Sequence, residues 1–294
     1  MRRSVGVVLL VLGGLSFVLP VAGRQLTLLA PFGTLAPLIG MLLALIGAGV
    51  MAADAHRPSR TRRAPSAIWI GLVVLTMALL GAALWMNFFH AQVEVRMGIV
   101  QKIFYFHVPS AYAMYVGFGI CALGSAVFLA KRKDAWDALA VAGAEVGLLF
   151  CAVVLITGPL WARKAWGVWW TWDPRLTTTL LAGMIFTAYV VLRSFGGAGE
   201  AERRFAAGLA IVGLFDLPVI HYSVQRWRGT HPTVITNKGG GLTAEMGQAL
   251  GTGFILFTAL VALLIWTRMR TERQRQRLRA LELEAAERGL LEDV

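Results

Sequence analysis

The chain has 294 residues, of which 57% are hydrophobic and only 15% charged, a composition too apolar for an ordinary soluble domain of this length. The formal net charge of +12 would suit a nucleic-acid binder, but the basic residues are spread over alternate loops between long apolar segments, which argues against that function. We therefore expect an all-α protein, a polytopic bundle of transmembrane helices.

The predicted helices follow from the gaps between basic residues. A helix needs roughly 20 residues to cross the hydrocarbon core of a bilayer. Glycine and proline inside such segments are tolerated, because neighbouring helices satisfy the backbone groups that they free. About eight spans are predicted: Ser4–Ala22, Leu35–Ala53, Ala67–Phe89, Ala111–Ala130, Ala138–Leu160, Leu176–Leu192, Phe205–Val224 and Gly247–Thr267.

The domain organisation follows from where the chemistry-bearing residues lie. Residues 1–60 are expected to form an added N-terminal pair of helices, because these two spans carry no ionisable side chain. Residues 1–23 also fit a cleaved signal peptide, but the length of the apolar run favours a retained helix. Residues 61–267 form a six-span domain with an outer segment at 161–177, and residues 268–294 form a charged cytoplasmic tail.

The basic residues also predict the orientation in the membrane. Most of the 28 lysines and arginines occupy alternate loops, and such an excess marks the cytoplasmic side. Both termini are then cytoplasmic, whereas His107, the segment 161–177 and His221 lie on the outer side. The excess is carried by Arg2–Arg3, Arg57–Arg63, Lys131–Lys133, Arg193–Arg204 and the arginines after Thr267.

Five of the ten tryptophans lie within the outer segment 161–177, which also carries three basic residues. On a helix, a spacing of i, i+3, i+4 and i+7 would gather three indoles and a carboxylate on one face. We expect a short outer helix with a broad indole platform, which suits a porphyrin. The alternative is an aromatic belt that anchors helix ends. The five tryptophans are Trp161, Trp166, Trp169, Trp170 and Trp172, and the carboxylate is Asp173.

Charged residues around the platform have separate expected roles. Asp173 precedes Pro174, and aspartate as N-cap with proline at the first helical position is a common helix start. We therefore expect Asp173 to cap the span that follows. Arg163, Lys164 and Arg175 flank the indoles and are candidates to bind haem propionates, since a guanidinium binds carboxylates in a bidentate manner.

Two histidines are candidates for ligands of haem iron. His107 and His221 lie at the outer ends of their spans, and a neutral imidazole nitrogen is a good axial ligand. Two such ligands leave no open coordination position, which suits carrying haem more than reacting with it. His90 and His231 are also outside and are weaker candidates, because a lone interfacial histidine is usually an amphipathic anchor.

Two carboxylates fall inside predicted spans, where ionisable groups are costly and are functional candidates by default. Asp216 lies near the outer end of its span and is expected to orient His221 or to cap the backbone freed at Pro218. Glu145 lies toward the cytoplasmic end. It could serve a path for haem, although a protonated or paired carboxyl is the simpler interpretation.

Three motifs resemble a known family. WGVWWTWDPRLT at 166–177 resembles the WWD signature of the CcmC/CcsA proteins, which handle haem in cytochrome c maturation. KIFYFHVPSA at 102–111 and LPVIHYSV at 217–224 resemble the two histidine motifs of its CcmC branch, haem exporter protein C. The resemblance covers roughly Ala67 to Thr267.

The resemblance implies the roles of the site residues. His107 and His221 would be the axial ligands of the iron, and haem b would be bound transiently. Lys102 matches a basic position that the family uses near haem. The haem-presenting surface would comprise Trp161, Trp166, Trp169, Trp170, Trp172, Asp173 and Arg175.

The resemblance also implies location and partners. The protein would lie in the bacterial inner membrane with its haem site on the periplasmic side. It would present haem to a CcmE-like periplasmic chaperone, together with CcmA/CcmB-like subunits of an ATP-binding cassette transporter and a small CcmD-like subunit. Without a visible nucleophile or acid–base pair, the chain is not expected to be an enzyme.

Alternative functions remain open at this point. Asp173–Pro174 and His231–Pro232 are similar to the CcsA branch, whose members belong to a haem lyase that attaches haem to apocytochrome c. A membrane b-type cytochrome would need facing histidine pairs within the bundle, and the chain lacks them. A transporter that passes haem through its own centre is a further alternative.

Overall fold

The computed structural model describes residues 67–195, 199–227, 229–231 and 241–290. Within these residues the regular structure is helical, and an isolated bridge between Glu94 and Gly98 is the only β pairing. The long helices are α3 (Ala67–Trp85), α4 (Phe104–Lys131), α5 (Asp134–Trp166), α6 (Pro174–Phe195), α7 (Glu200–Trp227) and α8 (Ala244–Glu287). A π-helical turn, Met86–His90, continues α3, and a 3-10 helix, Ile99–Ile103, leads into α4.

Six helices are long and apolar enough to cross a membrane, and they correspond to the six predicted spans from Ala67 onward. The all-helical, membrane-spanning fold class is therefore confirmed. The two predicted spans before residue 61 lie outside the described residues.

The helices extend beyond the predicted spans. The fourth helix begins at Phe104 rather than Ala111, so His107 lies inside a helix and not in a loop. The last helix continues through the basic tail to Glu287 instead of ending near Thr267. The physical reason is that gaps in charge mark the bilayer core, whereas backbone hydrogen bonding continues through the interface and into water.

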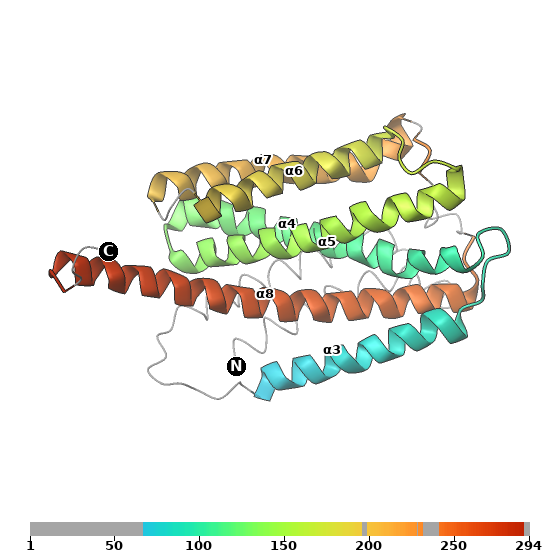
Figure 1. Cartoon of the computed structure of the whole chain (residues 1–294), viewed down its shortest axis with the longest axis horizontal. Helices are drawn as coiled ribbons and strands as arrows, with labels where there is room; N and C mark the ends of the chain where they lie inside the picture. Colours follow the sequence, from blue (N-terminus) through green and yellow to red (C-terminus); the bar gives the residue numbers. More distant parts are fainter. Residues whose placement is uncertain (1–66, 196–198, 228, 232–240, 291–294) are drawn as a thin grey trace, which may run out of the picture.

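The helices run antiparallel, with α4 and α5 packed together near the centre of the bundle (Figure 1). The α6–α7 pair lies on one side of α4 and α5, and α8 and α3 lie on the other side. The helix α3 packs on α8 through Leu72, Ala259, Ala262 and Trp266, and most of its remaining surface is exposed. The end of α8 projects beyond the other helices (Figure 1).

The contact between α4 and α5 depends on glycine. A Cβ atom at Gly117 would lie 2.5 Å from the backbone of Gly147, and one at Gly143 would lie 2.5 Å from the backbone nitrogen of Cys121. Backbones approach this closely only where small residues face each other, a common device of helix packing in membranes. The helix α4, which carries His107, is therefore held closely against α5.

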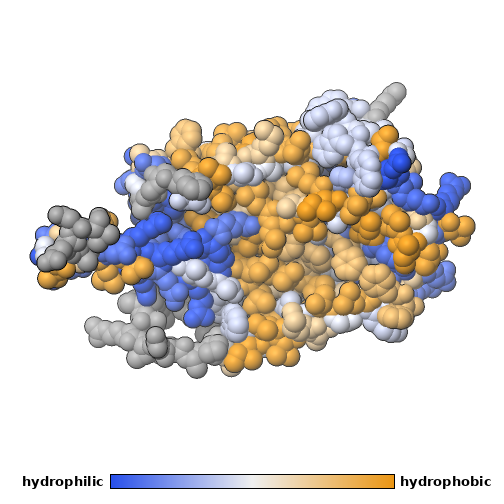
Figure 2. Space-filling model, in the orientation of Figure 1, coloured by the Kyte–Doolittle hydropathy of each residue, from blue (hydrophilic) through white to orange (hydrophobic). Residues whose placement is uncertain are grey.

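The surface of the bundle carries a broad band of apolar side chains between two hydrophilic ends (Figure 2). Large exposed residues in this band include Val74, Met77, Met184, Val212 and Phe215. A soluble monomer rarely exposes a continuous apolar surface of this size. The band therefore fits the hydrocarbon core of a membrane.

We predict that Gly117→Ala destabilises the protein by about 1–3 kcal/mol, because the added methyl group overpacks the α4–α5 contact. Thermal unfolding of the protein in detergent measures the change. The matched control is Gly208→Ala on α7, where nothing lies within 4 Å of the added atom, so its stability should be unchanged or higher. Equal melting temperatures for the two variants would contradict the glycine-dependent contact.

Candidate haem-binding site

The sequence-predicted site residues gather at one end of the bundle, where α4 and α6 begin and α5 and α7 end (Figure 1). His107 is on the first turn of α4, and His221 is near the end of α7. The tryptophan segment, residues 161–172, covers the end of α5 and its connection to α6. Residues from distant parts of the sequence thus meet at one end of the bundle.

The hydrogen bonds of His107 fix its tautomer. Its Nδ1 lies 2.8 Å from the Thr157 hydroxyl oxygen, and that hydroxyl lies 2.7 Å from the Val153 carbonyl oxygen. A carbonyl only accepts, so the single hydroxyl proton goes to Val153 and His107 must donate from Nδ1. The lone pair is then on Nε2, which is the state that an iron ligand requires.

Thr157 was missed by the sequence analysis. It sits in the apolar run LITGPL of α5, four residues before Trp161, and nothing in the local pattern relates it to a histidine fifty positions earlier. Its only signal was a hydroxyl near the outer end of an apolar helix.

The predicted short helix through Trp166 and Asp173 is wrong. The helix α5 ends at Trp166, and Gly167 adopts the left-handed φ of 78° that closes helices, donating its N–H to the Arg163 carbonyl at 3.2 Å. Pro174 starts α6 and disfavours a helical conformation at the residue before it. Residues 167–173 therefore form a non-helical connection.

The indoles consequently form edge-to-face pairs rather than a flat platform. Trp161 and Trp166 have ring centroids 5.4 Å apart, and Trp170 and Trp172 have centroids 5.8 Å apart. Trp172 is 75% exposed and Trp169 is 56% exposed. These exposed indoles offer apolar faces on which a flat aromatic ligand can stack.

Asp173 caps α6, as predicted. Its Oδ1 accepts from the Arg175 N–H at 2.9 Å, and its carbonyl accepts from the Thr177 N–H at 2.9 Å. Its Oδ2 binds a second segment that the sequence did not relate to it, accepting from the N–H groups of Thr230 at 2.5 Å and His231 at 3.3 Å. Burial alone would raise the pKa of Asp173, but these backbone donors outweigh it, and its pKa is lowered.

Arg175 ties the start of α6 to the end of α7. Its guanidinium donates to the carbonyl oxygens of Ile220 at 3.3 Å and His221 at 3.0 Å. It also donates to Nδ1 of His231 at 3.3 Å, so His231 carries its proton on Nε2. His231 is thus a hydrogen-bond donor at Nε2, the opposite tautomer to that of His107. We call these bonds of Asp173 and Arg175 the Asp173–Arg175 clasp.

The ring of His221 is exposed and lies edge-on to Tyr222, with centroids 4.9 Å apart. Its helix packs against α4, which carries His107. Within the described residues the two imidazole rings make no direct ring contact. Trp166 instead contacts His231, at a centroid distance of 6.3 Å.

Two further cationic candidates, Lys102 and Arg163, have different bonding partners. Lys102 is buried, and its ammonium donates to the carbonyls of Ala91 and Gln92 and not toward the indoles. Arg163 lies 6.0 Å from the ring centroid of Trp169 and donates to the Gly167 carbonyl.

The structure also places three further candidates from the sequence: His90, Asp216 and Glu145. His90 bonds through Nε2 to Gln248 of α8 at 2.8 Å. Asp216 is buried and, within the described chain, makes no hydrogen bond to His221. Glu145 lies toward the opposite end of the bundle and pairs with Arg268, which agrees with the interpretation of a paired carboxyl.

We predict that Asp173→Asn lowers the free energy of unfolding by about 1–3 kcal/mol, because it weakens charge-assisted bonds to the 229–231 segment. The pKa of Asp173 lies below its ordinary value of 3.8, so its stabilising effect is complete above that pH and is lost as the pH falls through the folded-state pKa. Melting temperatures at pH 6 and pH 3 check this. The variant should show a smaller acid-induced loss than the parent, and equal losses would contradict the role of the carboxylate. Glu282→Gln, at an exposed carboxylate of α8 that has no ion pair among the described residues, is the control.

The chain is similar to proteins of one known family. The family model of CcmC, heme exporter protein C, matches residues 51–284. A protein named heme exporter protein C from Bradyrhizobium diazoefficiens is 31% identical over 80% of this chain and 90% of its own length. Proteins of the same name from Rhodobacter capsulatus and Escherichia coli are 29% and 30% identical, over 73% and 55% of this chain and 89% and 66% of their own lengths. The chain belongs to the CcmC family.

Proposed function

We propose that this protein binds haem b at the tryptophan-rich end of the bundle and presents it to a periplasmic haem chaperone. Membership of a family described as heme exporter protein C supports a role in haem handling for cytochrome c maturation, in a multi-pass protein of the inner membrane. The single observation that carries the site is the tautomer of His107, which keeps Nε2 available for iron.

The second axial ligand in this proposal is His221. Two axial ligands would hold the iron from opposite faces of a porphyrin, so they must come from neighbouring elements. His107 and His221 come from packed helices and lie at the same end of the bundle, which supports the pairing. Arg175 holds the backbone of α7 at His221 itself.

The side of the membrane follows from charge. The end of the bundle opposite the tryptophans carries Lys131–Lys133, Arg193, Arg203, Arg204 and the basic part of α8. Such an excess favours the cytoplasm. The haem site would then face the periplasm, where a CcmE-like chaperone takes the haem.

Transfer requires that part of the haem stays accessible. Trp169 and Trp172 are exposed, so a porphyrin stacked on them keeps an edge toward the partner. Arg163, beside Trp169, is placed to meet a propionate. CcmA/CcmB-like transporter subunits and a small CcmD-like subunit are the expected membrane partners, and the chain itself performs no covalent chemistry.

We predict a six-coordinate, low-spin absorption spectrum for the purified protein with haem. His107→Ala and His221→Ala should each lose the haem or convert it to a high-spin form, because each removes one axial ligand. His90→Ala is the matched control, since His90 is bonded to Gln248, and it should leave the spectrum unchanged. Parent-like spectra for both ligand variants would refute the assignment.

We predict that Thr157→Val weakens haem binding by roughly tenfold, because His107 loses the acceptor that holds its proton on Nδ1. Thr157→Ser keeps a hydroxyl at the same place and should retain the affinity of the parent. Titration with haem, followed by absorbance, measures both constants. Equal affinities for the valine and serine variants would mean that the hydroxyl has no part in binding.

A further inference from the structure

A cavity lies at the end of the bundle opposite the tryptophans, between α5, α6 and α8. Its volume is about 120 Å³, well above the roughly 30 Å³ that one water occupies in the liquid. Arginines outnumber acids in its lining. The ionisable lining residues are Arg193 of α6, Arg268, Arg275 and Arg279 of α8, and the acids Glu145 and Glu272.

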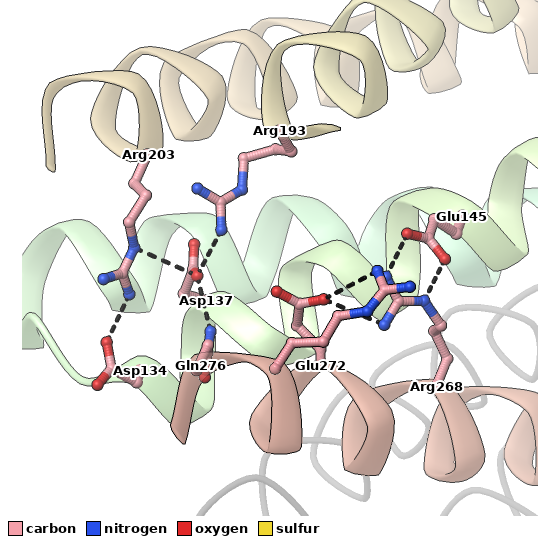
Figure 3. Close-up of polar contacts among 9 residues, drawn as sticks. Asp134, Asp137, Glu145, Arg193, Arg203, Arg268, Glu272 and Gln276 are labelled. Atoms are coloured by element: carbon pink, nitrogen blue, oxygen red, sulfur yellow. Dashed lines mark hydrogen bonds and ion pairs between the residues drawn. The ribbon is translucent and has the colours of Figure 1, made fainter. Parts of the chain in front are cut away.

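The acids around this cavity already have arginine partners (Figure 3). Arg268 pairs with Glu145 and, at 3.1 Å, with Glu272. Arg275 reaches Glu272 only at 4.0 Å, and Arg279 has no ion pair within the described residues. The cavity therefore retains an excess of positive charge.

The neighbouring carboxylate Asp137 offsets the charge of Arg193 but leaves most donors of this arginine unused. Its Oδ2 is shared by Arg193 at 2.7 Å, Arg203 at 3.3 Å and the amide of Gln276 at 3.0 Å (Figure 3). Arg203 also pairs with Asp134 at 2.6 Å, so the two aspartates offset Arg193 and Arg203, and the excess charge comes from the arginines of α8. Asp137 uses only one nitrogen of Arg193.

Arg193 has unused donors beside the cavity. Its side chain is only 7% exposed, yet its Nε and Nη1 have no hydrogen-bond partner within the described chain. Buried polar groups are nearly always bonded, since leaving a donor unsatisfied is costly. An anion in the cavity would satisfy one of these donors.

We propose that this cavity binds a phosphate-bearing anion, supplied either by the headgroup of an anionic phospholipid or by a free phosphate compound. A planar guanidinium donates two parallel hydrogen bonds to phosphate oxygens, and four arginines line this site. Anionic headgroups concentrate at the cytoplasmic leaflet, beside which basic segments of membrane proteins lie. The site is separate from the haem site, at the other end of the helices.

The test uses the full-length protein in neutral detergent with two probes. Inorganic phosphate is compared with chloride at equal ionic strength by the shift in melting temperature. Phosphatidylglycerol is compared with phosphatidylcholine by lipid retention in native mass spectrometry. The variant is Arg275→Gln with Arg279→Gln, at two exposed positions. It keeps the shorter ion pairs of Arg193 and Arg268 and removes only the 4.0 Å contact between Arg275 and Glu272.

The matched control is Arg270→Gln with Arg277→Gln, which removes the same charge from exposed positions of α8 outside the cavity lining. We expect the apparent Kd of the binding probe to rise about tenfold in the cavity variant and to stay within twofold in the control. The haem spectrum should be unchanged in both. Phosphatidylglycerol binding without phosphate binding assigns the headgroup as the source, and phosphate binding assigns the free compound. Preference for neither probe, or an equal loss in the control, overturns the proposal.

Discussion

The Asp173–Arg175 clasp is the interaction on which the candidate site depends. Asp173 joins the first turn of α6 to the 229–231 segment, and Arg175 joins the same turn to the last turns of α7. These two side chains, separated by one proline, thereby set the position of His221 relative to the tryptophan segment. The WWD motif therefore connects the start of α6 with the end of α7, in addition to supplying indoles.

Two histidines at this end of the bundle, His107 and His231, carry their protons on different ring nitrogens. His107 donates from Nδ1 to Thr157, whereas His231 accepts at Nδ1 from Arg175. The protein's own hydrogen bonds thus set which ring nitrogen carries the proton. In the proposed haem site, such preorganisation would lower the cost of ordering His107 on binding.

The sequence predicts the fold class and the positions of the spans from Ala67 onward, because long apolar segments can hide their backbone groups in lipid only as helices. It also predicts the cap at Asp173, since Asp–Pro before an apolar run is a local signal. The helix through Trp166 and Asp173 was wrong, because periodicity outweighed the more local signals of Gly167 and Pro174. Thr157, Thr230 and the cavity arginines depend on contacts between distant segments, which no local pattern contains.

The helix α8 runs without interruption for 44 residues, a length of about 66 Å at the ordinary rise of 1.5 Å per residue. This is about twice the thickness of the hydrocarbon core, roughly 30 Å. Near its first turn Gln248 bonds to His90, and far along it Arg268 pairs with Glu145. One uninterrupted helix therefore connects the contact with His90, at the tryptophan end of the bundle, with the ion pairs at the opposite end.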